Sequence, residues 1–262
     1  MIIPKQLATN CWKQPGREAW LRSLPALLES MTRLWSLRVG APFDHANVTC
    51  SWVAPAVRSD GTSAVLKLAM PPMEGAHEIR GLRFWCGNPT VQLLEADDER
   101  GAMLLERCEP GNTFQSEPEP YQDVIIVSLL KRLWRRSSAQ HGFRPLSFLL
   151  ENWRSETLAQ VQNWPDPGLV REGLRTARTL SNPASTDALL ATDLHAGDLV
   201  QHLIVCESWL HADPIGLVRR LADLAEVDRD RLSLWTFVRV SAEPRTNWSN
   251  LLWMDIAKAL AP

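Results

Sequence analysis

The chain has 262 residues, of which 45% are hydrophobic and 22% are charged, and this composition supplies enough apolar surface for a large core in one sizeable domain or two lobes. Its 28 Lys and Arg residues are balanced by 30 Asp and Glu residues, which gives a formal charge of −2 at pH 7. A protein that binds a phosphate backbone usually carries a basic excess. Nucleic acid is therefore not expected as a partner.

The five cysteines are spread along the chain without the short spacings of a metal site: Cys11, Cys50, Cys86, Cys108 and Cys206. Their odd number and their scatter predict reduced thiols and a cytoplasmic location. The chain has no run of about 18 apolar residues, and its N-terminal segment lacks a basic stretch followed by an apolar one. We therefore expect neither a membrane span nor secretion.

The N-terminal part mixes helical and strand patterns. Apolar side chains recur three or four residues apart over 17–36 and, more briefly, over 77–85, which predicts two helices. Two β-prone runs within 47–70 flank the tight-turn pair Asp60-Gly61, which predicts a hairpin.

Two further strands are expected at 90–94 and 102–106, around an acidic turn at 97–101. Together with the hairpin they predict a small sheet. The first 108 residues should therefore form a β-sheet lobe that carries helices.

After the loop that begins at Glu109, the pattern becomes helical. The segments with helical spacing are 123–136, 146–162, 168–180, 217–227, 229–240 and 248–260. The stretch 187–213 is harder to assign, because polar residues interrupt its apolar runs and residues 199–210 fit a helix or a strand. A mainly helical second lobe follows, and its polar break is a candidate site.

Lys67 lies at the centre of the apolar segment 64–68, where a charge is costly unless it is paired. Phosphoryl transfer needs phosphates held by a cation, metal ions held by carboxylates and an acceptor hydroxyl aimed in line. Glu78, at the start of the next predicted helix, is a candidate partner for such a cation. The alternative is a lysine on an edge strand whose amine extends into water.

The polar break contains the sequence TDLHAGD at 192–198, and Asp213-Pro214 follows it. Asp193 could orient a substrate hydroxyl and help to deprotonate it. Asp198 and Asp213 could give magnesium its hard oxygen ligands. Aspartates beside glycine or proline also form turns, so turn formation is the alternative for each of them.

Several segments together resemble the streptomycin kinases and hydroxyurea phosphotransferases of the aminoglycoside/hydroxyurea phosphotransferase family. These segments are 61–67, 77–78, 82–87, 91–97, 104–111, 192–198, 213–223 and 232–235. Their order and spacing agree over nearly the whole chain, so the set is far more specific than any one motif. The resemblance implies an α+β, protein-kinase-like two-lobed fold, with 1–108 as the nucleotide-binding lobe and 109–262 as the helical lobe with the catalytic loop.

The resemblance also implies roles for individual residues. Lys67 would contact the phosphates of ATP, Glu78 would pair with that lysine, and Asp193 falls on the catalytic aspartate. The hinge against which adenine lies would be formed by Leu104, Leu105, Glu106 and Arg107. The implied activity is an ATP- and Mg²⁺-dependent phosphotransfer to a hydroxyl of a small molecule such as an aminoglycoside or hydroxyurea.

The chain is too short after Asp193 to hold all the segments that follow in this family, and the gap can be placed in two ways. In the first, Asp198 replaces a metal-binding asparagine and 209–214 is the metal segment, which keeps a ligand at Asp213. In the second, which leaves the later residues in family order without another gap, the deletion falls between Gly197 and Asp198 and both metal ligands are lost.

The metal ligands therefore stay unassigned, and the helical lobe is expected to be shortened. A catalytically impaired relative that binds nucleotide or ligand without turnover is the alternative function.

Overall fold

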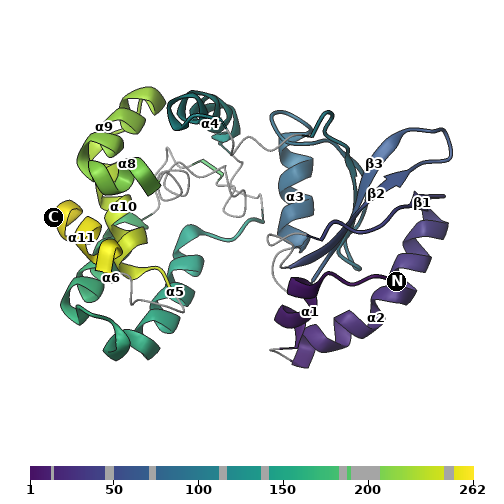
Figure 1. Ribbon diagram of the computed structural model, residues 1–262, viewed down its shortest axis with the longest axis horizontal. Coiled ribbons are helices and arrows are strands. Elements are labelled where there is room, and N and C mark those ends of the chain that lie inside the picture. The colour runs from purple at the N-terminus through teal and green to yellow at the C-terminus, as the bar shows by residue number, and fades with distance from the viewer. Residues whose placement is uncertain are drawn as a thin grey trace. The chain divides into compact units, whose positions relative to one another are not determined.

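A computed structural model describes residues 1–12, 15–44, 50–70, 75–111, 117–136, 142–182, 188–189, 207–244 and 251–262. These residues belong to two compact units, Met1–Thr113 and Phe114–Pro262. The first unit combines a sheet with helices and the described part of the second is helical (Figure 1). The fold class is therefore α+β, as predicted.

The N-terminal unit is built on a five-stranded antiparallel sheet. Its strands are β1 (Arg38–Val39), β2 (Ser51–Val57), β3 (Ser63–Ala69), β4 (Leu93–Asp97) and β5 (Ala102–Glu106), in the order β1-β2-β3-β5-β4. The predicted hairpin is confirmed as β2 and β3, which pair along their whole length. At its turn, Asp60 Oδ1 accepts a hydrogen bond from the Thr62 amide at 2.9 Å, and Gly61 has a φ of +87°, which glycine adopts without strain.

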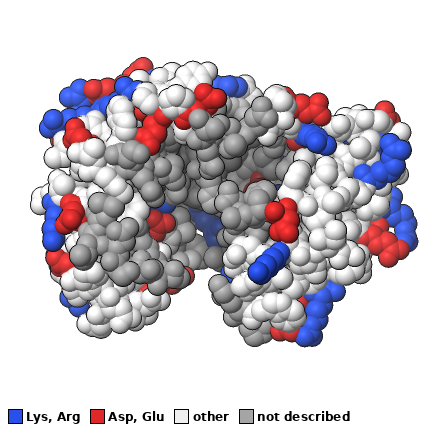
Figure 2. All heavy atoms as spheres, in the orientation of Figure 1, with Lys and Arg blue, Asp and Glu red and all other residues white. Residues whose placement is uncertain are grey.

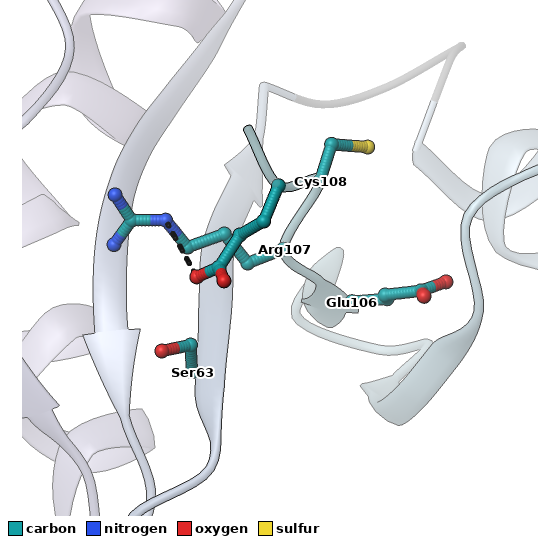
Figure 3. A pocket seen from close by; sticks show the side chains of 5 residues that line it. Ser63, Glu106, Arg107 and Cys108 are labelled. Carbon is teal, nitrogen blue, oxygen red and sulfur yellow. Dashed lines mark ion pairs between the residues drawn. The ribbon is translucent and has the colours of Figure 1, made fainter. Parts of the chain in front are cut away.

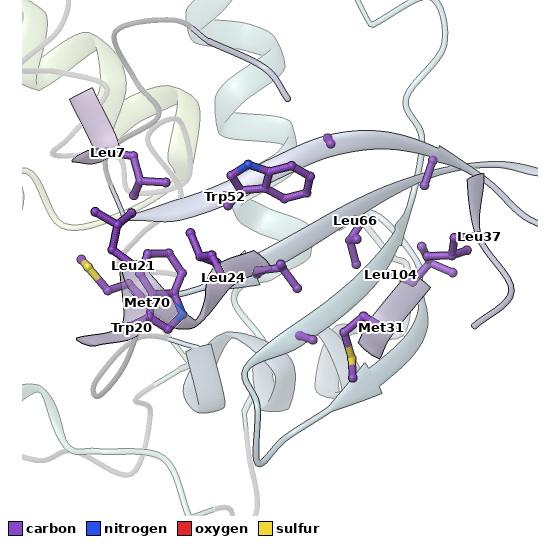
Figure 4. Close-up of a cluster of buried hydrophobic side chains, with 14 of the residues drawn as sticks. Leu7, Trp20, Leu21, Leu24, Met31, Leu37, Trp52, Leu66, Met70 and Leu104 are labelled. Carbon is purple, nitrogen blue, oxygen red and sulfur yellow. The ribbon is translucent and has the colours of Figure 1, made fainter. Parts of the chain in front are cut away.

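One face of the sheet packs against α1 (Lys5–Cys11) and α2 (Pro15–Leu34). Trp52, Leu66 and Leu104 reach this core from three neighbouring strands, and Leu24 of α2 meets them (Figure 4). Trp52 Nε1 also donates to the carbonyl of Ile2 at 3.0 Å. The N-terminal segment is thereby fixed to the main apolar core of the unit.

The opposite face of the sheet packs against α3 (Gly75–Trp85). Ile79 and Leu82 of α3 are buried with Met103 and Leu105 of β5. Because side chains alternate along a strand, the residues of β3 that leave the first core point towards this second one. Lys67 is one of them.

Three elements of this unit, β1, β4 and α1, differ from the prediction, and β1 was not predicted as a strand. The sequence predicts a strand at 90–94, but β4 spans Leu93–Asp97, because its pairing with β5 contains a bulge and continues to Asp97 opposite Ala102. Asp97 therefore ends a strand, and the turn begins one residue later than expected. Helix α1 was not predicted, since Leu7 and Cys11 are its only buried residues and form a single pair at helical spacing.

The described part of the C-terminal unit consists of helices. They are α4 (Glu119–Leu133), α5 (Leu146–Gln160), a 3₁₀ turn (Val161–Asn163), α6 (Pro167–Leu180), α8 (Glu207–Ala212), α9 (Pro214–Ala225), α10 (Arg229–Ala242) and α11 (Leu251–Leu260). The predicted helices are confirmed with shifted ends, and the described end of the ambiguous stretch is helical. Helices α6 and α9 begin with proline after an aspartate cap, where the missing N–H has no cost.

The described surface carries charges of both signs. Figure 2 shows acidic and basic side chains interspersed on the visible face. Many of them lie in ion pairs along one helix, such as Arg33–Glu29 at 2.6 Å in α2 and Arg154–Glu151 at 3.1 Å in α5. Among the described helices, none is both long enough and apolar enough to span a membrane.

Helices α6 and α10 cross closely at Gly173. A Cβ atom on Gly173 would overlap Ser241 Oγ and lie 3.0 Å from Ala242 Cβ, and the Ser241 hydroxyl donates to the Phe237 carbonyl at 2.6 Å. Gly173→Ala is therefore expected to lower the free energy of unfolding by about 1–3 kcal/mol, the usual cost of overpacking. Denaturant unfolding followed by circular dichroism measures this.

Gly16→Ala is the matched control, because nothing lies within 4 Å of a Cβ atom at that position. Its free energy of unfolding should be equal to or above that of the unmodified chain. Equal stability of the Gly173 variant and the unmodified chain would contradict the close crossing.

Candidate active site

Lys67 and Glu78 form an ion pair in the N-terminal unit. The register of the sheet places Lys67 between Val53 of β2 and Met103 of β5, and Glu78 lies in the first turn of α3. Lys67 Nζ donates to Glu78 Oε1 at 2.5 Å. The edge-strand alternative for Lys67 is wrong, because β3 lies between β2 and β5 in the sheet.

The Lys67–Glu78 pair is only partly buried, with 21% and 27% of the two side chains exposed. The carboxylate compensates the cost of holding a cation among apolar strand residues. An ammonium group has three donors, so one contact with Glu78 leaves Lys67 able to bind a further anion. The arrangement suits a cation that holds an oxyanion from solvent.

The predicted hinge, residues 104–107, is the end of β5 and the residue after it. Leu104 is fully buried in the core against α1 and α2, and Leu105 is buried on the α3 face. Glu106 is exposed, and its Oε2 accepts from the Gln92 amide at 3.0 Å while its own amide donates to the Gln92 carbonyl at 2.9 Å. The backbone at the end of β5 is thereby fixed, and a ligand could reach Glu106 and Arg107 but not the side chain of Leu104.

A pocket of about 620 Å³ lies beside this segment. It is lined by Ser63, Glu106, Arg107, Cys108 and Glu109 (Figure 3). The Arg107 guanidinium lies 4.0 Å from Glu109, and both side chains are well exposed. The volume of the pocket is in the range of small-molecule sites, and its walls are mainly polar.

Two of these pocket residues, Ser63 and Cys108, were not predicted as site residues from the sequence. Ser63 follows the hairpin turn, whereas Cys108 and Glu109 follow the hinge. They meet because Ala64 pairs with Glu106, which places the first residue of β3 beside the end of β5. The sequence does not show the register in which β3 pairs with β5, because α3 and β4 lie between these two strands in the chain.

The other predicted site residues divide into two groups. Asp193 and Asp198 lie outside the described residues. Asp213 is the N-cap of α9, and its Oδ1 accepts from the Gly216 amide at 2.8 Å. The turn-forming alternative therefore describes the local structure at Asp213, and within the described ranges no three His, Cys, Asp or Glu side chains gather as a metal site.

Residues 38–231 match the sequence profile of the aminoglycoside/hydroxyurea antibiotic resistance kinases. The chain belongs to this family. The matched region begins at β1 and ends in α10, so it contains the Lys67–Glu78 pair, the hinge and the segment with Asp193.

Individual kinases of this family are similar over most of the chain. A streptomycin 6-kinase of Streptomyces glaucescens is 34% identical over 219 residues, which are 81% of this chain and 69% of the relative. A streptomycin 6-kinase of Streptomyces griseus is 30% identical over 302 residues and covers 99% of this chain and 94% of the relative. A hydroxyurea phosphotransferase of Kitasatospora aureofaciens is 33% identical over 203 residues, which are 76% of this chain and 58% of that protein.

The comparison with the Streptomyces griseus kinase extends over 302 positions, whereas the chain has 262 residues. At least 40 of these positions are therefore gaps in this chain. The relative has segments that this family member lacks.

A solved structure has the same fold. It is assigned as a fructosamine-3-kinase from Thermobifida fusca, with a TM-score of 0.55, 16% sequence identity, and coverage of 88% of this chain and 97% of that chain. At this identity the likeness concerns the fold alone. The chain has a protein-kinase-like fold, as predicted.

Proposed function

We propose that this family member is an ATP-dependent phosphotransferase that phosphorylates a hydroxyl group of a small molecule, such as a streptomycin-like aminoglycoside or hydroxyurea. The observation that carries the proposal is the Lys67–Glu78 pair at 2.5 Å, formed by a central strand and the helix that follows it. The names of the relatives, two streptomycin 6-kinases and a hydroxyurea phosphotransferase, support the substrate class.

In this proposal the N-terminal unit binds ATP. Lys67 holds phosphate oxygens, and Glu78 keeps the ammonium group in place. The adenine ring lies against the hinge, where Glu106 and Arg107 border the pocket of about 620 Å³. Val65, two residues before Lys67 on the same sheet face, offers an apolar surface on the way from the pocket to the lysine.

The C-terminal unit contributes the acceptor site and the catalytic loop. Asp193 accepts the proton of the acceptor hydroxyl as its oxygen bonds to the γ-phosphorus, and the bond from that phosphorus to the leaving ADP breaks. Magnesium, when bound, would offset charge on the phosphates. Asp198 and Asp213 are the candidate ligands for it, and Asp213 Oδ1 also accepts from the Gly216 amide in the cap of α9.

We also propose a cytoplasmic location, where ATP is available and thiols stay reduced. None of the described cysteines forms a disulfide. This location is part of the proposal and is independent of the roles given to Lys67 and Asp193.

A second candidate function is a relative that binds nucleotide or ligand without turnover. The observation that favours it is the set of at least 40 gap positions against the Streptomyces griseus kinase. If that gap falls beside Asp198, the ligands for magnesium are lost and turnover should fall steeply. Nucleotide binding at Lys67 would remain.

Thermal unfolding with Mg-ATP tests nucleotide binding. A ligand at about 100 times its dissociation constant adds about 2.7 kcal/mol to the free energy of unfolding, so the unfolding midpoint should rise as ATP is added. ADP release with streptomycin, related aminoglycosides or hydroxyurea as acceptor then separates the two candidates. Acceptor-dependent ADP release supports the phosphotransferase, and nucleotide binding without release supports the second candidate. The absence of a midpoint shift contradicts the phosphotransferase and leaves, of the second candidate, only a relative that binds the acceptor ligand.

A further inference from the structure

We propose that Arg83 and Asp98 are positioning residues for the Lys67–Glu78 pair. They fix the C-terminal end of α3 to the β4–β5 turn, so that Glu78, at the other end of the helix, stays within reach of Lys67. The expected effect on ATP affinity rests on the proposed function, whereas the expected effect on the position of α3 does not.

Arg83 and Asp98 form a two-point contact between α3 and the sheet. Arg83 lies in the last turn of α3, and its Nη1 and Nη2 donate to Asp98 Oδ1 and Oδ2 at 2.8 and 2.6 Å. Two parallel hydrogen bonds between planar groups fix direction as well as distance. The contact therefore restrains both the position and the rotation of this end of the helix.

The turn that presents Asp98 is itself closed by hydrogen bonds. Asp97 Oδ1 accepts from the Arg100 amide at 2.9 Å, and Asp97 Oδ2 accepts from Arg100 Nη1 at 2.6 Å. Gly101 completes the turn with a φ of +62°. Hydrogen bonding from Arg83 holds the pKa of Asp98 below its usual value of 3.8, so this carboxylate is charged at neutral pH.

The apolar contacts of α3 do not by themselves fix the position of the helix along the sheet. Ile79 and Leu82 bury the middle of the helix against β5, but hydrophobic contact is non-directional and permits small shifts along the sheet. Glu78 in the first turn and Arg83 in the last turn are the charges that the helix dipole favours at those ends. One ion pair thus joins the first turn of α3 to Lys67 of β3, and the other joins its last turn to Asp98 of the β4–β5 turn. The two pairs together fix the helix.

The expected effect is modest, because Arg83 and Asp98 are each about half exposed and exposed ion pairs are weak. Loss of the pair should raise the dissociation constant for ATP about two- to fivefold. The affinity for adenosine, which lacks phosphates, should not change. A general loss of folding would instead weaken the binding of both ATP and adenosine.

The experiment uses the full chain with Arg83→Ala, Asp98→Asn and the charge-swapped double variant Arg83→Asp with Asp98→Arg. Hydrogen exchange of the α3 amides is measured without nucleotide, and calorimetry gives the affinities for ATP and adenosine. Arg33→Ala is the matched control, since Arg33 forms a 2.6 Å ion pair with Glu29 in the same unit but within one helix. Both single variants should exchange faster in α3 and bind ATP more weakly. The swapped pair should restore part of both properties, because it re-forms the ion pair but places an aspartate at the helix end that favours a cation.

Two results would overturn the proposal. One is α3 exchange in the single variants equal to that of the Arg33 control. The other is weaker ATP binding that the charge swap does not restore while α3 exchange returns to normal. If the unmodified chain binds no ATP, the proposed function fails, and the exchange rates of α3 still decide whether Arg83 and Asp98 position this helix.

Discussion

Replacing Asp193 with alanine is expected to lower kcat for acceptor-dependent ADP release by about 10²- to 10⁴-fold. This is the usual contribution of a positioned general base. Asp193 lies in the TDLHAGD segment, within the region that matches the kinase family. Because the base acts on the acceptor hydroxyl, the rise in unfolding midpoint caused by Mg-ATP should be retained.

Steady-state kinetics with a saturating acceptor measure this effect. Asp193→Asn is a useful companion variant, since it keeps the size of the side chain and removes its basicity. Turnover that survives either substitution unchanged would show that another group accepts the proton. A parallel loss of the Mg-ATP midpoint shift would show that Asp193 acts in nucleotide binding instead.

Replacing Lys67 with methionine is expected to lower kcat/KM for ATP by about 10²- to 10³-fold. A fixed charge aimed at a centre where negative charge develops typically contributes this much. Methionine retains an unbranched side chain at this position, so the pairing of β3 with β5, in which residue 67 lies opposite Met103, should persist. Initial rates at varied ATP concentration give the ratio.

Lys131→Met is the matched control for Lys67. Lys131 Nζ lies 2.7 Å from Glu226 Oε1, so it too loses an ion pair with a carboxylate, but in the C-terminal unit and without a proposed role. Its kcat/KM should stay within about twofold of the unmodified chain, because exposed pairs contribute little. Equal losses in the two variants would indicate that folding, and not phosphate binding, is affected.

The Lys67–Glu78 contact could be predicted in part from local reasons, and the family resemblance selected it over the edge-strand alternative. A lysine in an apolar strand needs a partner, and Glu78 lies in the first turn of the next helix after a short connection. The hairpin could be predicted for a similar reason, since Asp60-Gly61 is a turn signal that needs no tertiary context. Short-range rules were therefore enough for the hairpin, whereas the ion pair also needed the resemblance to the family.

The pocket beside the hinge could not be predicted in the same way. It depends on the register in which β3 pairs with β5, and α3 and β4 lie between these two strands in the sequence. The contact between Arg83 and Asp98 also depends on tertiary packing, since it joins α3 to the β4–β5 turn. Periodicity shows that a segment is a strand or a helix, but it does not show which residues of two such segments become neighbours.

Asp213 shows how one residue can satisfy two interpretations of the sequence. An aspartate followed by proline and, two residues after the proline, by glycine fits a metal segment and also an aspartate cap with proline at the first helical position. In the structure the Asp213 carboxylate accepts a hydrogen bond from the Gly216 amide, and α9 begins at Pro214. Local capping chemistry therefore describes this position.

In the proposed function Lys67 holds the phosphates of ATP, and calorimetric titration of ATP and adenosine into the unmodified chain and the Lys67→Met variant measures this role. We predict that the unmodified chain binds ATP more tightly than adenosine, and that the variant loses this difference while keeping its affinity for adenosine. The same preference for ATP over adenosine in both proteins would contradict this role for Lys67.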